Sequence, residues 1–241
     1  MSIIRAIKNS LARRKRIEEN KYDKIISLGY NCEVTFRFLK YFGFEITNLF
    51  NWTYSYSIKD LINSLNNFDS ICSGEMQKPD PLWECKNTHL RFHGKADTRI
   101  FMKHRETEEI LKQDKEDLLG RVAHLKEKFL NILKDESKKL YVYKIKKEDI
   151  DENVNETINS LRKALINLGG RNFKLLIVVE KENIHYFKES EDFILRTVKY
   201  FAPDACLVRK KYINNGWDDI YNEFYVDAPD ENKKDKKYKF D

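Results

Sequence analysis

Glycine and proline are scarce in this sequence, with 8 Gly and 4 Pro among 241 residues. This scarcity excludes a collagen-like chain and a low-complexity, linker-like protein. Long apolar stretches are missing as well. The longest aliphatic run covers only residues 175–179, whereas a membrane-spanning helix needs about 20 apolar residues. Hydrophobic residues nevertheless make up 41% and aromatic residues 13% of the chain, which indicates a folded core.

The excess positive charge is confined to the N-terminus. The net charge is +6, and residues 1–16 hold six basic and no acidic residues, which leaves 39 basic and 39 acidic residues elsewhere. We expect no nucleic-acid partner, because this neutral remainder lacks an extended basic footprint. Ile3, Ile4, Ile7 and Leu11 fall on one helical stripe. Residues 1–16 are therefore predicted to form a cationic arm that makes a peripheral membrane contact, binds a partner, or packs on its own domain.

The cysteines and the N-terminal residues bear on the compartment. Cys32, Cys72, Cys85 and Cys206 are widely scattered, and no apolar segment of about 7–15 residues follows the basic start, as it would in a secretory signal. We therefore expect free thiols in a reducing compartment. This predicts a cytoplasmic protein, which residues 1–16 could hold at the inner face of the membrane.

Apolar periodicity predicts strands that alternate with helices along the chain. The predicted strands are 24–29, 49–53, 140–145 and 173–179, the predicted helices are 34–42, 58–68, 106–135, 154–168 and 218–224, and residues 191–200 fit either. Residues 69–105 are predicted to be irregular. This order is typical of an α/β fold in a single layered domain, with a mostly parallel sheet flanked by helices. We assign a basic amphipathic arm to 1–20, the α/β domain to 21–226 and a disordered, charged tail to 227–241.

Cys32 lies at a predicted strand-to-helix turn, three residues after Gly29. In parallel sheets the carboxyl ends of the strands form the site. The helix dipole and backbone N–H groups at such a turn stabilise a thiolate and can hold an oxyanion. The pattern thus favours Cys32 as a nucleophile, and an inert core thiol is the alternative.

The residues around Cys32 resemble the opening of a bacterial family of unknown function that is labelled papain-like cysteine peptidase. The resemblance covers S-L-G-Y-N-C-E-V at 27–34, Phe38-Leu39, Gly43 and L-F-N-W at 49–52, against the family's S-L-G-x-x-C, L-R-x-x-G-L-like and P-F-D-W segments. Looser matches are 90–93, Arg121 and 140–144. The resemblance implies a nucleophilic Cys32, a base at His93, and Asn51, Trp52 and Arg121 around the pocket.

Three positions depart from the family pattern. Asn51 and Gly94 stand where the family has Asp, and Lys144 stands where it has Arg. A more distant resemblance links the Gly-x-x-Cys turn to capsule-cluster acetyltransferases, which use coenzyme A. Both resemblances imply one chemistry: a thiolate attacks an acyl carbon, a His moves the proton, and water or a hydroxyl accepts the acyl group. The substrate would be a small molecule, a glycan or a peptide, and coenzyme A enters only with the acetyltransferase.

Five histidines are available as the base, since His titrates near neutral pH. His93 leads, because it lies in an aromatic, non-helical stretch and matches the family's His, and His104 follows in the same region. His124 and His185 are expected at the surface. The third catalytic member stays open among Asp97, Asn51, Asp218 and Asp219.

The turn itself offers candidates for holding the oxyanion. These are the backbone N–H groups after Cys32, at Glu33 and beyond, and the side chain of Asn31. Asn31 could instead bond the turn backbone. A third hypothesis is a non-catalytic α/β module docked to a membrane-bound assembly, which the missing acids at positions 51 and 94 favour.

Cys85, His89 and His93 follow one another at intervals of four residues, which could place metal ligands on one side of a helix or strand. No C-x2-C or C-x4-C half-site completes this set, so we expect no metal. No P-loop, dinucleotide fingerprint or H-E-x-x-H motif is present either, so we expect no cofactor for a hydrolase.

Overall fold

The computed structural model describes residues 19–78, 82–94, 108–188, 190–205, 208 and 215–226. The predictions for the arm, for the tail at 227–241, and for Asp97, His104 and Cys206 lie outside these residues. Within them, no helix combines the length and the apolar character that crossing a membrane would require.

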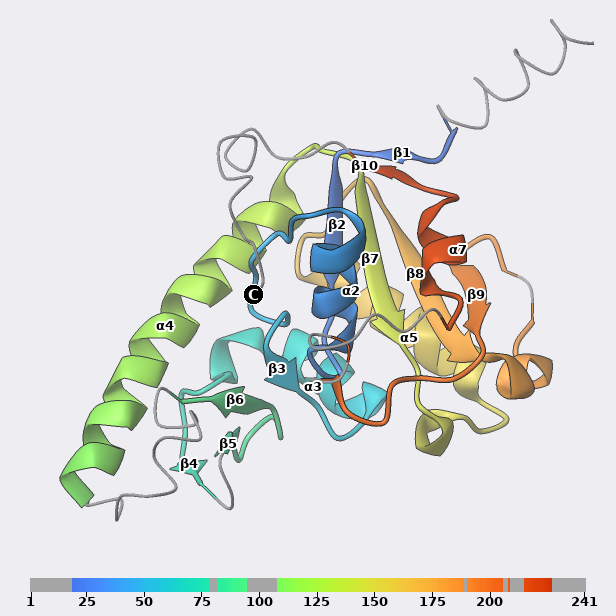
Figure 1. Ribbon diagram of the computed structural model, residues 1–241. Coiled ribbons are helices and arrows are strands. Elements are labelled where there is room, and N and C mark those ends of the chain that lie inside the picture. The colour runs from blue at the N-terminus through green and yellow to red at the C-terminus, as the bar shows by residue number, and fades with distance from the viewer. Residues whose placement is uncertain are drawn as a thin grey trace, which may run out of the picture.

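A four-stranded parallel sheet forms the centre of the fold (Figure 1). Its strands are β2 (Lys24–Ser27), β7 (Lys139–Lys144), β8 (Phe173–Glu180) and β9 (Ile194–Val198), in the spatial order β2-β7-β8-β9. The predicted strands at 24–29, 140–145 and 173–179 are confirmed, and the open choice at 191–200 resolves as strand β9. The fold is therefore α/β, as expected.

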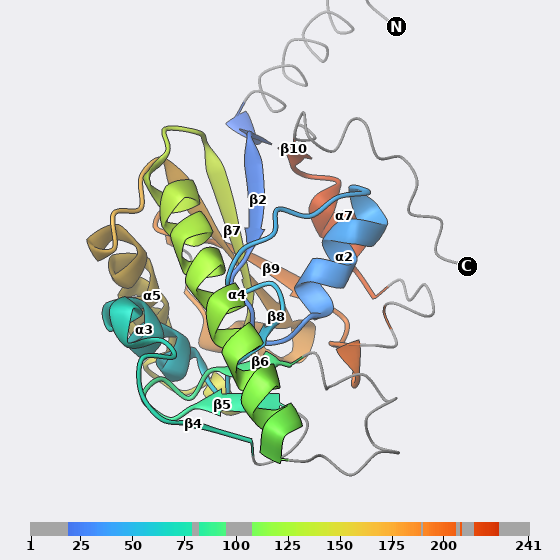
Figure 2. The same cartoon turned by 90° about the vertical axis from the view of Figure 1, so that its left-hand side faces the viewer.

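Helices cover both faces of this sheet (Figure 2). On one face lie α2 (Glu33–Tyr41) and α7 (Trp217–Tyr221), and on the other lie α3 (Ile58–Asn66), α4 (Glu108–Lys134) and α5 (Val154–Asn167). Successive strand residues point to opposite faces. Val142 and Leu176 belong to the core under α2 and α7, whereas Tyr141 and Ile177 belong to the core under α3, α4 and α5. Burial on both faces explains why these strands read as continuous apolar runs.

A second sheet, of four short antiparallel strands, corrects the prediction that residues 69–105 are irregular. It contains β3 (Thr53–Tyr54), β4 (Met76–Gln77), β5 (Leu82–Cys85) and β6 (Arg91–His93), in the order β3-β6-β5-β4. The extended piece predicted at 49–53 contributes only β3, and it joins this sheet rather than the parallel one. Strands of two to four residues are too short for alternation to show in the sequence.

Short elements complete the described chain. They are the parallel pair β1 (Lys21–Tyr22) and β10 (Tyr225–Val226), and the 3-10 helices η1 (Phe68–Ser70), η4 (Lys147–Asp149) and η5 (Lys181–Tyr186). The first pair brings the two ends of the described chain together.

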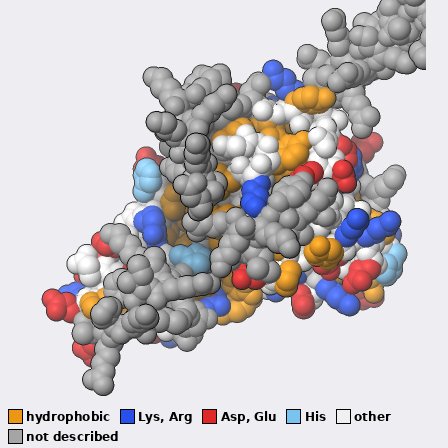
Figure 3. Space-filling view, in the orientation of Figure 1, with side chains coloured by type: hydrophobic (Ala, Val, Ile, Leu, Met, Phe, Trp, Pro, Cys, Tyr) orange, Lys and Arg blue, Asp and Glu red, His pale blue; other side chains and the backbone are white. Residues whose placement is uncertain are grey.

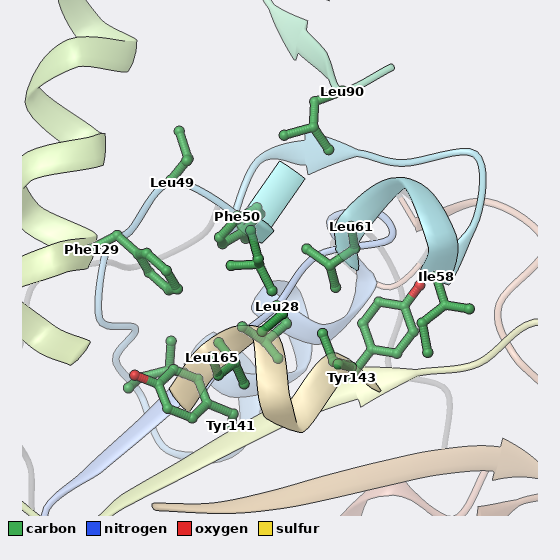
Figure 4. Close-up of a cluster of buried hydrophobic side chains, with 14 of the residues drawn as sticks. Leu28, Leu49, Phe50, Ile58, Leu61, Leu90, Phe129, Tyr141, Tyr143 and Leu165 are labelled. Atoms are coloured by element: carbon green, nitrogen blue, oxygen red, sulfur yellow. The ribbon is translucent and has the colours of Figure 1, made fainter. Parts of the chain in front are cut away.

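The small sheet is joined to the parallel sheet by apolar packing (Figure 4). Leu90, next to β6, and Phe50, before β3, belong to the same buried cluster as Leu28, after β2. Phe50 also meets Phe129 of α4 edge-on, with ring centroids 4.9 Å apart. This shared core holds the two sheets in a fixed arrangement, because close-packed interiors resist displacement.

Asp135, which follows α4, ties this helix to the parallel sheet. Its carboxylate accepts hydrogen bonds from Lys24 and Ser137 and, at 2.9 Å, from the buried Lys139. Burial alone would raise the pKa of Asp135, but the three hydrogen-bond donors outweigh burial and hold this pKa at about 2.

We expect Asp135→Asn to destabilise the protein in a pH-dependent way. A carboxyl with a depressed folded-state pKa stabilises fully above its ordinary pKa of 3.8, and this contribution is lost as the pH falls toward 2. The difference in free energy of unfolding between wild type and variant should therefore narrow between pH 6 and pH 3 in urea titrations. Asp192→Asn, which breaks the exposed pair with Arg162, is the control. An equal difference at both pH values would contradict this role.

Candidate active site

The loop between β2 and α2 is a tight turn that requires glycine. Gly29 has a φ of +87° and Tyr30 a φ of +73°, both left-handed. A side chain at position 29 would also bring its Cβ to 3.1 Å from the Phe50 carbonyl oxygen. The Ser55 amide donates a 3.3 Å hydrogen bond to the Tyr30 carbonyl, which ties the turn to β3. The chain then reaches Cys32, the residue just before the first turn of α2.

This turn places Cys32 opposite a histidine from the other sheet. The Sγ atom of Cys32 lies 3.9 Å from Nε2 of His93. Cys32 is half-buried, while His93 is exposed as the last residue of β6. The distance is at the long end for a hydrogen bond to sulfur, as is common in sites without substrate. The residues predicted as nucleophile and base therefore lie within reach of each other.

Arg121 fixes the backbone that carries this histidine. It projects from α4, and its guanidinium group donates a hydrogen bond to the His93 carbonyl oxygen. Arg121 also lines the cavity beside Cys32. The residue predicted from the looser family match thus lies at the site, where it links α4 to the end of β6.

Cys32 and His93 open into a cavity of about 680 Å³. Its wall comes from the loop after β2, α2, the small antiparallel sheet with the loop before it, α4 and the segment after β9. The lining residues include Asn31, Phe36, Leu49, Trp52, Thr53, Tyr54, Leu82, Phe92, Val122, Leu125 and 203–205. Figure 3 shows hydrophobic side chains gathered in the middle of this face of the molecule. A volume of this size is typical of small-molecule sites, which measure about 300–1,000 Å³.

The side chain of Asn31 bonds the backbone of the turn, which reduces the number of N–H groups that could hold an oxyanion. Its Oδ1 atom accepts a 3.0 Å hydrogen bond from the Glu33 amide. The first N–H group after Cys32 is therefore already engaged, which corrects its assignment to an oxyanion. The amide nitrogen of Asn31 is the candidate donor that remains at this residue, and Asn31 lines the cavity.

The Glu33 side chain points away from the cavity into a buried charge cluster. Its carboxylate accepts hydrogen bonds from Lys144 at 2.5 Å, from Arg37 at 3.2 Å and from the Ala202 amide at 3.2 Å. All three charged side chains are at most 3% exposed. Burial lowers the pKa of Lys144, and the Glu33 carboxylate opposes this effect. Lys144 thus keeps a basic group where the resembled family has Arg.

Asn51 and Trp52, which are adjacent in the sequence, have different surroundings. Trp52 lines the cavity and packs edge-on against Phe36, with ring centroids 5.3 Å apart. Asn51 is 1% exposed and bonds the side chains of Asn48 and Glu45 instead. This corrects the expectation that Asn51 lines the pocket, because its amide stabilises the turn before β3.

Gly94 leaves room for a carboxylate from another element. A Cβ at position 94 would clash with the carboxylate of Asp114, which lies on α4. Asp114 is buried, accepts a 2.7 Å hydrogen bond from the Trp83 indole and lies 4.0 Å from the Lys78 ammonium. An acid therefore lies beside position 94 although the sequence has none there.

The other predicted acids and histidines in the described residues are not part of the cavity wall, whereas Asp204, which the sequence did not single out, lines it. Asp218 and Asp219 open α7 and are not lining residues. His124 and His185 are exposed, as expected. The Nδ1 atom of His89 lies 3.4 Å from Glu84.

The other two described cysteines interact with each other. The Cys72 amide donates a 3.1 Å hydrogen bond to the Cys85 sulfur. A hydrogen bond between the two side chains lowers the pKa of Cys85 to about 5 and raises that of Cys72. Across the described ranges, no three His, Cys, Asp or Glu side chains gather as a metal would need. The spacing of Cys85, His89 and His93 therefore does not translate into a shared site.

Comparison of the chain with protein-family models, with curated proteins and with solved structures gave no match. The function of the chain is therefore inferred from the geometry around Cys32 and from the motif in the sequence.

We expect Gly29→Ala to destabilise the protein by about 1–2 kcal/mol, the cost of a left-handed conformation for a residue with a side chain. The close Phe50 carbonyl adds to this cost. Gly120→Ala in α4 is the matched control, because its added Cβ meets no atom within 4 Å. That change should stabilise the helix by about 0.5–1 kcal/mol. Urea unfolding measures both, and equal effects would contradict the turn geometry.

We expect Glu33→Gln to lower the free energy of unfolding by about 3 kcal/mol, because it leaves Lys144 and Arg37 buried without their countercharge. Glu182→Gln makes the same chemical change at an exposed pair, 3.9 Å from Lys147. The control should cost less than about 1 kcal/mol. Denaturant titration compares the two, and a similar loss in both variants would show that the buried cluster is not stabilising.

Proposed function

We propose that the protein is a cysteine-nucleophile enzyme of acyl transfer or hydrolysis, with Cys32 as nucleophile and His93 as base. The observation that carries this proposal is the 3.9 Å approach of Sγ to Nε2 at the wall of a substrate-sized cavity. The resemblance to the papain-like cysteine peptidase family supports it independently, because the same two residues match that motif.

In the first half-reaction, the Cys32 thiol gives its proton to Nε2 of His93, and the sulfur attacks the acyl carbon of the substrate. A bond forms between sulfur and carbon, and the carbonyl oxygen becomes an oxyanion. The N-terminal end of α2 and the Asn31 amide are the groups placed to stabilise that charge. The leaving group then departs with the proton that His93 held, which leaves an acyl-enzyme on Cys32.

In the second half-reaction, an acceptor hydroxyl attacks the acyl-enzyme and gives its proton to His93. The sulfur–carbon bond breaks, and the proton returns to Cys32. Water as acceptor makes the protein a hydrolase, and a sugar hydroxyl makes it an O-acyltransferase in surface polysaccharide synthesis. Arg121 acts as a positioning residue, since it holds the His93 carbonyl rather than the reacting atoms.

Alkylation with iodoacetamide at pH 6, followed residue by residue by mass spectrometry, tests the proposal. We expect Cys32 to react about tenfold faster than the same cysteine in denatured protein, because the imidazole and the helix N-terminus favour the thiolate. Site-resolved detection is needed because the hydrogen bond from Cys72 lowers the pKa of Cys85 to about 5, although Cys85 is fully buried.

A matched pair of variants separates His93 from a general effect of histidine loss. His93→Asn should remove most of the rate enhancement at Cys32. His89→Asn should leave it unchanged, and Asn tolerates the positive φ of 55° at that position. A wild-type Cys32 that reacts no faster than the denatured thiol would refute the enzyme and favour the non-catalytic module.

A further inference from the structure

We infer that the cavity beside Cys32 binds the hydrocarbon part of an uncharged, medium-chain acyl ester or thioester. This inference rests on the proposed nucleophilic role of Cys32 and adds the class of acyl group that the site accepts. It comes from the chemistry of the cavity wall, which extends well beyond the two reacting side chains.

The wall of the cavity is mostly apolar. Apolar residues make up most of the described lining, among them Phe36, Leu49, Trp52, Leu82, Phe92, Val122 and Leu125. These seven come from α2, the loop before β3, β5, β6 and α4. Transfer of a hydrocarbon chain from water to such a surface is favourable, and the gain grows with each CH₂ group that is buried.

Four polar residues of the wall gather at one place, and the wall also includes Thr53, Tyr54 and Asp204. Cys32 and His93 face each other, Asn31 adjoins Cys32, and Arg121 bonds the His93 backbone. The carbonyl end of an acyl group would meet these polar groups, while its chain would extend along the apolar wall. A peptide fits this wall less well, because each buried backbone N–H and C=O group needs a hydrogen-bond partner.

Val122 of α4 lies in the wall of the cavity. It is 2% exposed and lies in the wall of a second cavity as well, of about 370 Å³. That second cavity is lined by Leu119, Ala123 and Lys126 of α4 and by 71–73. Truncation of Val122 should therefore lengthen the space open to an acyl chain. Leu125, one turn further along α4, lines only the first cavity, and a larger side chain there should shorten this space.

Hydrolysis of p-nitrophenyl acetate, octanoate and laurate tests the inference. We expect wild type to prefer octanoate over acetate by about tenfold or more in kcat/KM, since each methylene in an apolar pocket adds discrimination. Leu125→Trp should reduce the octanoate-to-acetate ratio about tenfold. Val122→Ala should raise the laurate-to-octanoate ratio. Val154→Ala is the matched control, because Val154 is buried at the start of α5 and does not line the cavity.

Two results separate the failure of this inference from the failure of the proposed function. Cys32→Ala should abolish hydrolysis of all three esters, and if it does not, Cys32 is not the nucleophile. If hydrolysis depends on Cys32 but the chain-length ratios are equal in wild type, Leu125→Trp and Val122→Ala, the acyl pocket is wrong and the nucleophile stands. Calorimetric binding of N-methyloctanamide, an unreactive amide that carries the C8 chain on its carbonyl, to Cys32→Ala protein tests the pocket without catalysis. Binding that Leu125→Trp weakens supports the pocket, and no binding overturns it.

Discussion

The site depends on the buried ion pairs and hydrogen bonds of the Glu33 carboxylate. This carboxylate lies one residue after Cys32 and joins three separate parts of the chain through Arg37, Lys144 and the Ala202 amide. Buried charges are costly to desolvate, so such a cluster is tolerated only where the geometry pairs every charge. Here it fixes the start of α2 against the end of β7, and it fixes the segment after β9 against both.

The pocket wall follows from this constraint. The segment that begins at Ala202 continues into residues 203–205, which close one side of the cavity. On the opposite side, Arg121 attaches α4 to the backbone of His93. Cys32, His93 and the cavity therefore come from elements that are held by the Glu33 cluster, by the Arg121 hydrogen bond and by the apolar core around Phe50 and Phe129. None of these elements could form the site alone.

Much of the parallel sheet could be predicted from the sequence, because strands buried on both faces read as apolar runs and long helices show their period. β8, β7 and α5 fall within two residues of their predicted bounds. The small antiparallel sheet could not be predicted, since its strands are too short to alternate visibly and depend on pairing over long separations. The turn between Gly29 and Cys32 could be predicted, because a short apolar strand, a Gly and the start of a helical pattern follow one another directly in the sequence.

The roles of individual polar residues were harder to predict. Glu33 and Arg37 have the i, i+4 spacing of a helical ion pair, which was a usable signal. Their third partner, Lys144, is 111 residues from Glu33, and no local pattern connects the two. Asn51 was placed in the pocket because it stands where the resembled family has Asp, but residues 51–52 form a turn in which the Asn51 amide bonds Asn48 and Glu45. The Asp114 carboxylate beside Gly94 likewise depends on tertiary packing alone.

The division of the site between two sheets has a consequence for folding. Cys32 follows a strand of the parallel sheet, whereas His93 ends a strand of the small sheet, 61 residues away. Contacts between residues far apart in the chain carry a loop-closure cost and form only when the elements that hold them have met. The approach of the sulfur to the imidazole is therefore a property of the assembled fold, and an incompletely folded chain does not hold the two side chains together.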